Sequence, residues 1–182
     1  MKADNNNKLW WLVAGAGALL AARSIYRNLT AYDFSGKTVL ITGGSRGLGL
    51  VMARQLAKEG ARLVLCARDE TELENARMEL AGKGADVLVQ KCDVTVEQQV
   101  NDMITNVLNE FGPIDVLINN AGVISAGPIA EMTLLEFEEA MKTHFWGPLY
   151  TTLAVLPSMK ARGEGRILNI ASIGGKISVP HL

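Results

Sequence analysis

The chain has 182 residues, enough for one domain with a hydrophobic core of its own. Its 18 basic side chains nearly balance its 19 acidic ones, which argues against a nucleic-acid partner, because such partners usually meet a basic face. Two cysteines, Cys66 and Cys92, are too few for a disulfide scaffold. They indicate a reducing compartment, and their places at the ends of apolar runs favour small buried thiols.

The N-terminal residues 1–33 differ in character from the rest and are expected to form an apolar segment and a linker. The apolar run Leu9 to Ala22 is shorter than the roughly twenty residues that span a bilayer as a helix. Trp10, Trp11 and the arginines that follow favour a short anchor that holds a cytoplasmic domain at a membrane. A packed helix and a signal peptide are the alternatives.

The same segment contains a Gly-x-Gly pair, Gly15 and Gly17, that looks like a nucleotide-binding turn. Such a turn needs a strand before it and a helix after it within a βαβ unit. Here apolar residues continue on both sides of the glycines, so we reject it.

The stretch "TVLITGGSRGLGLVMARQLAKEG" predicts a strand, a glycine-rich turn and a helix in succession. "TVLI" is β-branched and apolar, as is typical of a buried parallel strand. Gly43, Gly47 and Gly49 let the backbone turn tightly and approach a pyrophosphate. The helix from Leu48 to Glu59 would point its N-terminal amides at that pyrophosphate, and Gly60 would end it.

The rest of the chain repeats this unit. Four further strands are predicted in "ARLVLCA", "DVLVQKC", "IDVLINNAG" and "GRILNIAS", with helices between them. Capping boxes Thr95-x-x-Gln98 and Thr133-x-x-Glu136 open two of these helices, and Pro148 should kink the second. The alternation predicts an α/β fold over residues 34–182: a Rossmann-like, doubly wound parallel sheet of strand order 3-2-1-4-5.

Four motifs, in the right order and on the right elements, resemble those of the short-chain dehydrogenases/reductases. They are Thr42-Gly43-x-x-x-Gly47-x-Gly49, Asp93-Val94, Asn119-Asn120-Ala121-Gly122 and, at the end of the fifth strand, Ser172. The resemblance covers residues 34–182. It implies hydride transfer between a nicotinamide cofactor and a small-molecule carbonyl or secondary alcohol, and a homo-oligomer at full length. No metal site is predicted.

The resemblance also assigns cofactor-binding roles. Asp93 would accept a hydrogen bond from the adenine amino group, and the segment at Asn120 would form the floor under the adenosine ribose. The two asparagines could also simply stabilise the turn after the strand, and both uses can coexist. The full expected cofactor set is Gly43, Ser45, Arg46, Gly47, Leu48, Gly49, Arg68, Asp93, Val94, Asn120, Ala121 and Gly122.

The choice of cofactor follows from charge. NAD-binding sites place a carboxylate at the end of the second strand to bind the ribose 2′-hydroxyl. Here Ala67 stands at that place, Arg68 follows it, and Arg46 lies in the glycine turn. Two guanidiniums can flank a 2′-phosphate, so we expect NADP(H). Two solvated surface arginines are the alternative, and Asp69 is expected to cap the next helix.

Catalysis in this family needs a serine and a tyrosine whose pKa is lowered by a lysine four residues later. Ser172 would polarise the substrate oxygen, but the tyrosine would fall past Leu182, and no Tyr-x-x-x-Lys occurs in the sequence. The sequence therefore predicts an inactive fragment without its C-terminal strands, which leaves the fifth strand as an apolar edge. The alternative is a non-catalytic NADP(H)-binding or membrane-associated module.

His144 occupies the position that a proton-relay asparagine usually has in this family. It could carry a proton near neutral pH, or it could fill the site and bond the backbone. The structural role is the preferred interpretation.

Overall fold

The computed structural model describes residues 15, 17, 32–125 and 127–176. The chain divides into two compact units, Met1–Asp33 and Phe34–Leu182. The proposed anchor Leu9 to Ala22 lies outside the described residues except for Gly15 and Gly17, whose backbone is helical. Within the described ranges, no helix has both the length and the apolar character that a membrane crossing requires.

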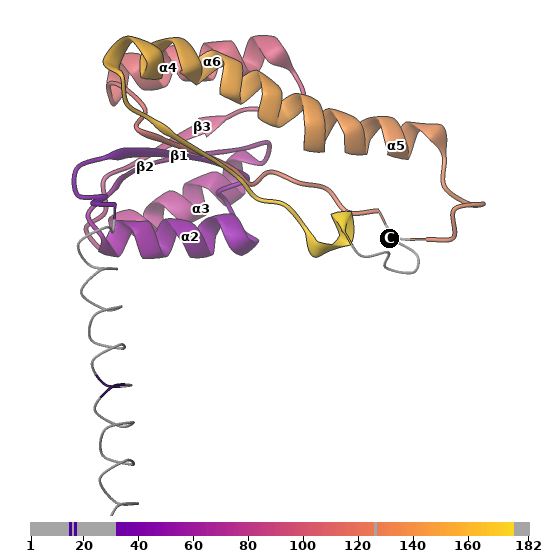
Figure 1. Cartoon of the computed structure of the whole chain (residues 1–182), viewed down its shortest axis with the longest axis horizontal. Coiled ribbons are helices and arrows are strands. Elements are labelled where there is room, and N and C mark those ends of the chain that lie inside the picture. The colour runs from indigo at the N-terminus through magenta and orange to yellow at the C-terminus, as the bar shows by residue number, and fades with distance from the viewer. Residues whose placement is uncertain (1–14, 16, 18–31, 126, 177–182) are drawn as a thin grey trace, which may run out of the picture. The chain divides into compact units, whose positions relative to one another are not determined.

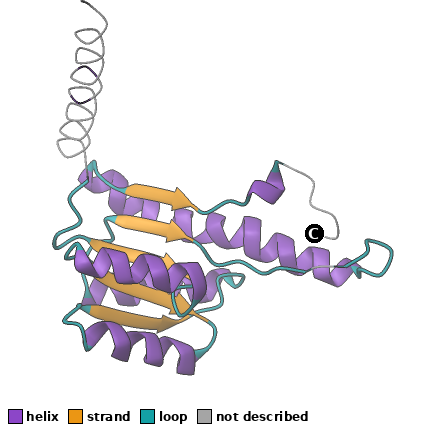
Figure 2. Cartoon of the chain, turned by 90° about the horizontal axis from the view of Figure 1, so that it is seen from below, coloured by secondary structure: helices purple, strands orange, loops and turns teal. Residues whose placement is uncertain are grey.

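The second unit contains a sheet of five parallel strands in the order β3-β2-β1-β4-β5, as the sequence predicts. The central strand β1 pairs with β2 on one side and β4 on the other, so the order reverses there. Figure 2 shows the strands running side by side in one direction. The strands are β1 Thr38–Thr42, β2 Arg62–Ala67, β3 Val87–Lys91, β4 Val116–Asn119 and β5 Arg166–Asn169.

Helices cover both faces of the sheet: α2 and α3 lie on one face, and α4 and α6 lie on the other (Figure 1). A π-helical turn, η1, joins α5 to α6, and a 3₁₀ turn, η2, follows β5. The helices are α2 Gly47–Lys58, α3 Glu70–Ala81, α4 Glu97–Glu110, α5 Leu134–Met141, η1 Lys142–Trp146, α6 Gly147–Arg162 and η2 Ile173–Gly175.

The core lies between the sheet and these helices. Every residue of β1 is buried, because the helical layers cover both of its faces and leave neither for polar side chains. Leu40 of β1 and Leu117 of β4 pack with Val100 and Val107 of α4 and Val155 of α6 in one cluster. This packing fixes the carboxyl ends of the strands, where the glycine turn begins.

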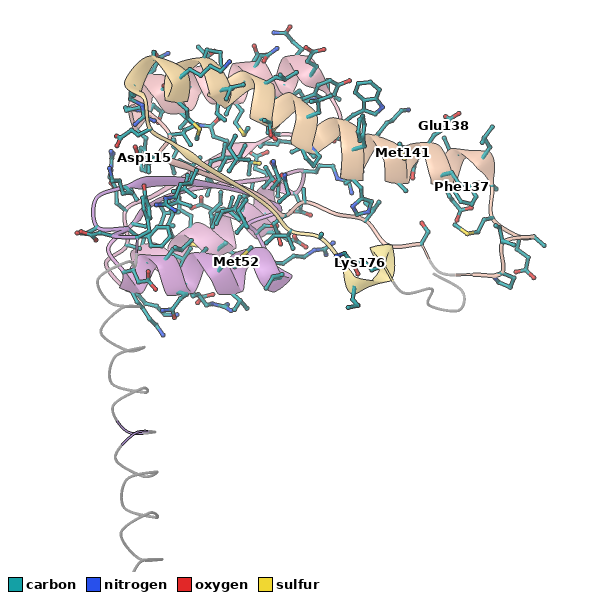
Figure 3. The ribbon with its side chains drawn as sticks, viewed as in Figure 1. Met52, Asp115, Phe137, Glu138, Met141 and Lys176 are labelled. Atoms are coloured by element: carbon teal, nitrogen blue, oxygen red, sulfur yellow. The ribbon has the colours of Figure 1, made fainter. Side chains whose placement is uncertain are left out.

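An arginine of α6 is hydrogen-bonded to the amino end of the sheet, whereas the edge strand β5 is exposed. At the amino end of β4, the Arg162 guanidinium of α6 bonds Asp115 Oδ1 at 2.7 Å and the Ile114 carbonyl at 2.7 Å. Figure 3 shows Asp115 at the opposite end of the sheet from Lys176, which follows β5. The edge strand β5 has four exposed residues, including Ile167 and Leu168.

Helix α5 runs beyond the sheet and buries none of its residues (Figure 1). Phe137 and Met141 project from it and are exposed (Figure 3). The capping box predicted for its start is confirmed: Glu136 N donates to the Thr133 hydroxyl, and the Glu136 carboxylate accepts from Thr133 N at 2.7 Å. Local sequence signals therefore set where this helix begins, although its packing does not hold it.

The predicted capping box at Thr95 is wrong. Helix α4 begins at Glu97, its N-cap residue is Val96, and no side chain caps it. The Asp93 carboxylate accepts hydrogen bonds from the Thr95 hydroxyl at 2.8 Å and from the Thr95 backbone amide at 2.9 Å. These bonds close a local turn before the helix. An aspartate two residues upstream thus competes for the group that the capping box needs.

The kink predicted at Pro148 takes the form of a π-helical turn just before it. Pro148 lies in the first turn of α6, directly after η1. Proline has no N–H, and its ring clashes with the carbonyl four residues back in a regular α-helix. A wider turn before the proline relieves that clash, as such turns do at many helix irregularities.

The first prediction concerns Glu79, which joins α3 to α2. Its carboxylate accepts two bonds from Arg54, at 2.8 and 2.7 Å, and one from Lys83 at 2.7 Å. The bonds from Arg54, then that from Lys83, lower the pKa of Glu79 to about 2. Because the folded state lowers this pKa, the carboxylate stabilises the fold above the unfolded value and loses that effect as pH falls toward 2.

Glu79→Gln should therefore lower the melting temperature at pH 7, with a difference from the parent that shrinks steadily from about pH 5 to pH 3. Thermal unfolding across this pH series measures it. Glu110→Gln is the control, since Glu110 is exposed and forms no ion pair with any described residue. A difference that stays constant with pH would contradict the prediction.

Candidate functional site

A cavity of about 640 Å³ opens at the carboxyl ends of the strands, beside the point where the strand order reverses. Open α/β sheets bind their ligands in such a crevice. Most of the expected cofactor-binding residues line it, from four separate strand ends. They are Gly43, Ser45, Arg46, Leu48, Arg68, Asp93, Val94, Asn120, Ala121 and Gly122.

The glycine turn is built so that larger residues do not fit. Gly43 and Gly47 have left-handed backbone angles, with φ of 64° and 54°. A Cβ added at Gly49 would lie 2.2 Å from the Gly43 carbonyl oxygen, so the turn and α2 must pack backbone to backbone. Arg46, the N-cap residue of α2, offers no side-chain acceptor to the first amides of the helix. These amides suit an anion such as a pyrophosphate.

The Thr42 hydroxyl ties this turn to β4. It accepts hydrogen bonds from Asn120 N at 2.9 Å and Ala121 N at 3.0 Å. The side-chain amide of Asn120 donates to the backbone carbonyls of Thr42 and Gly43, at 3.0 and 3.2 Å. The end of β1 and the end of β4 therefore form one hydrogen-bonded junction beneath the cavity.

Asn119 connects the next strand. Its side-chain amide donates to Asn169 Oδ1 of β5 at 2.8 Å, and its oxygen accepts from the Thr151 hydroxyl of α6 at 2.7 Å. Both asparagines thus stabilise the strand ends, which is one of the two uses that the sequence left open. Asn120 also lines the cavity, so its second use remains compatible with the structure.

Asp93 and Val94 reach the cavity from the end of β3. The Asp93 Oδ1 atom is engaged by Thr95, and its backbone amide donates to Gln99 Oε1 at 2.8 Å. Val94 is buried against α6, where a Cβ added at Gly147 would lie 3.0 Å from its Cγ2. These contacts hold the backbone after β3 in place at the rim of the cavity.

The charged side of the cavity contains the two expected arginines and an acid that the sequence analysis did not single out. Arg68 is exposed and makes no hydrogen bond or ion pair with any residue that the structure describes. Arg46 Nη1 donates to Glu72 Oε1 at 3.1 Å, and the Ser45 hydroxyl donates to Glu72 Oε2 at 3.0 Å. Asp69 caps α3 as predicted, accepting from Glu72 N at 2.9 Å.

A sequence signal for Glu72 existed. It lies three residues after the N-cap of α3, where an acidic side chain is favoured by the positive end of the helix. The spacing alone did not show that this carboxylate faces the glycine turn.

Cys66 and Cys92 also line the cavity, and both are free and buried. The hydrogen bond between the two thiols, together with burial, raises the pKa of Cys66 well above its usual range. Cys66 is therefore protonated at neutral pH, in keeping with small buried thiols that fill space.

The two candidate catalytic residues lie outside the lining of this cavity. Ser172 is exposed, and its hydroxyl accepts from Gly174 N at 3.1 Å at the start of η2. His144 Nε2 lies 2.8 Å from the Val123 carbonyl, which can only accept, so Nε2 carries the proton of this bond. Both roles therefore stay predictions. No cluster of metal-binding side chains occurs in the described part of the chain.

The short chain dehydrogenase family model matches residues 37–182. The chain belongs to the short-chain dehydrogenase family. Dehydrogenase/reductase SDR family member 7B of Danio rerio is 38% identical over 177 residues, which are 93% of this chain and 57% of that protein. This short-chain dehydrogenase chain thus spans little more than half the length of that curated relative.

Solved structures of the short-chain dehydrogenase family share the fold. A variant of actinorhodin polyketide ketoreductase with NADPH superposes with a TM-score of 0.78 at 38% identity, covering 84% of this chain and 59% of that one. A short-chain dehydrogenase/reductase from Burkholderia phymatum in complex with NAD gives a TM-score of 0.80 at 31% identity, with 83% and 54% covered. Both nicotinamide cofactors therefore occur among structures of this fold.

The second prediction tests the junction at Thr42. Thr42→Val keeps the shape of the side chain but removes the acceptor for two partly buried backbone amides. An unpaired buried group costs about 1–3 kcal/mol, and these amides are only partly buried, so the free energy of unfolding should fall by about 2–4 kcal/mol. Urea unfolding followed by circular dichroism measures the change.

Thr42→Ser is the matched control, because it keeps the hydroxyl and loses one methyl group, worth about 0.8 kcal/mol. If Thr42→Val is less destabilising than Thr42→Ser, the hydroxyl of Thr42 does not hold the strand ends together.

Proposed function

We propose that this chain is the cofactor-binding part of an NADP(H)-dependent oxidoreductase, which transfers a hydride between the cofactor and a carbonyl or secondary alcohol. One observation carries the choice of NADP(H): Arg46 and Arg68 line the same cavity as the glycine turn. At the end of β2, Ala67 stands where an NAD-binding site would present a carboxylate to the ribose 2′-hydroxyl.

The residues present suit this cofactor. The uncapped amides at the start of α2 would bind the pyrophosphate, and Gly49 leaves no side chain in the way. Arg68 and Arg46 would pair with the 2′-phosphate. Asp93, at the rim, would accept from the adenine amino group. When bound, the reduced cofactor supplies the hydride for the reaction.

On the substrate side, Ser172 would donate a hydrogen bond to the substrate oxygen and so stabilise the charge that develops on it. Its hydroxyl now accepts from Gly174 N, which leaves the hydroxyl proton available for donation. His144, through its bond to Val123, would position the segment that follows Asn119-Asn120-Ala121-Gly122. The protein resembles ketoreductases and dehydrogenases alike, and we therefore propose the reaction class and no particular substrate.

The third prediction concerns Arg68. In the parent chain, NADPH should bind more tightly than NADH. Arg68→Ala should weaken NADPH binding by about 1.5 kcal/mol, the lower end for a bond to a charged group, because this side chain is exposed. NADH binding should hardly change. Titration of nucleotide fluorescence measures both affinities.

Arg77→Ala serves as the control, since Arg77 also belongs to the α3 region but pairs with Glu74 and does not line the cavity. Equal affinity of the parent chain for NADPH and NADH would contradict the proposed cofactor.

The fourth prediction concerns turnover by the 182-residue chain. It contains no Tyr-x-x-x-Lys. A positioned acid or base contributes about 10²–10⁴-fold to such a reaction. We therefore expect NADPH binding without steady-state NADPH oxidation when the chain is mixed with a panel of carbonyl compounds. Clear oxidation, followed at the NADPH absorbance, would show that another residue supplies the proton, and His144→Phe would then be the first variant to test.

A further inference from the structure

A carboxylate already binds Arg46, one of the two arginines expected to pair with the 2′-phosphate, and the neighbouring Ser45 hydroxyl. Glu72 Oε1 accepts from the Arg46 guanidinium at 3.1 Å, and Glu72 Oε2 accepts from the Ser45 hydroxyl at 3.0 Å. The three side chains line one cavity together with Arg68. A phosphate and a carboxylate use the same donors, and both are negative, so they compete for these positions.

The position of Glu72 is fixed because its backbone belongs to a helix. Glu72 belongs to the first turn of α3, and its own amide is bound by the N-cap residue Asp69. Its side chain is 35% exposed, whereas that of Arg46 is 80% exposed. The ion pair therefore joins a largely exposed arginine to a carboxylate that is more buried and lies on α3.

We propose that Glu72 is a specificity-determining residue that lowers the preference of this chain for NADPH over NADH. The inference rests on the proposed function and names a residue that governs its cofactor choice. A 2′-phosphate would compete with Glu72 for the donors of Arg46 and Ser45 and would lie close to its negative charge. NADH has a 2′-hydroxyl in place of this phosphate, and it brings no such repulsion.

The two arginines consequently differ in what they contribute. Arg68 has no partner among the described residues and can meet a phosphate directly. Arg46 already donates to Glu72, which neutralises part of its charge. Removing the charge of Glu72 should thus strengthen phosphate binding through Arg46 and leave the contribution of Arg68 as it was.

The test uses the full 182-residue chain and two nucleotide probes, adenosine 2′,5′-bisphosphate and 5′-AMP, in isothermal titration calorimetry. Glu72→Gln should bind the bisphosphate about three- to ten-fold more tightly, the range expected for releasing an exposed ion pair and removing a nearby like charge. Its affinity for 5′-AMP should stay that of the parent. No gain for the bisphosphate, or an equal gain for both probes, would overturn the proposal.

A double-mutant cycle shows whether the effect passes through Arg46. In an Arg46→Ala background, Glu72→Gln should give a clearly smaller gain, because the competition for Arg46 has been removed and only the repulsion between Glu72 and the phosphate is relieved. A gain that persists undiminished would mean that Glu72 does not act through this arginine, and the proposal would fail.

Glu74→Gln is the matched control. Glu74 lies on the same helix, pairs with Arg77 and does not line the cavity, so the same change of charge should leave bisphosphate binding unaltered. An equal gain in this control would reduce the effect to the net charge of α3 and overturn the proposal. A parent chain that binds neither NADPH nor NADH overturns the proposed function and this inference together. NADPH binding with no effect of Glu72→Gln overturns the inference alone.

Discussion

One buried hydroxyl, that of Thr42, connects the glycine turn after β1 with the segment after β4. Thr42 ends β1, and through the amides of Asn120 and Ala121 it fixes the end of β4 to the start of the glycine turn. The turn can bring its backbone close to a ligand only while Asn120 holds the carbonyls of Thr42 and Gly43 in place. This contact therefore holds together the floor of the cavity and the strand ends from which the glycine turn begins.

Much of the fold could be read from the sequence because its signals are local and repeated. The apolar strand that ends at Thr42 predicted a fully buried β1. The glycine spacing predicted a tight turn, which the positive φ angles of Gly43 and Gly47 confirm. Asp69 and Thr133 cap their helices as their spacing indicates. The strand order followed from the alternation of elements, since right-handed crossovers leave few arrangements.

The features that were missed depend on competition between groups. Thr95 has the spacing of an N-cap residue, but its hydroxyl donates a hydrogen bond to the Asp93 carboxylate. Glu72 lies 26 positions from Arg46, and only the packing of α3 beside α2 brings the two together. The spacing of residues along the sequence shows which hydrogen bonds a side chain could form. It does not show which of the possible partners binds that side chain in the folded protein.

The π-helical turn η1 has a consequence for how helix faces are assigned. Such a turn contains one residue more than an α-helical turn, so it shifts the phase of the helix by about 100°. Residues before Lys142 and after Trp146 therefore do not share one helical wheel. Deleting a single residue from this turn would restore a regular helix but swing α5 by more than a quarter turn relative to α6. A change in length at this turn would therefore change which face of α5 lies on the side of α6, whereas a substitution would leave that face in place.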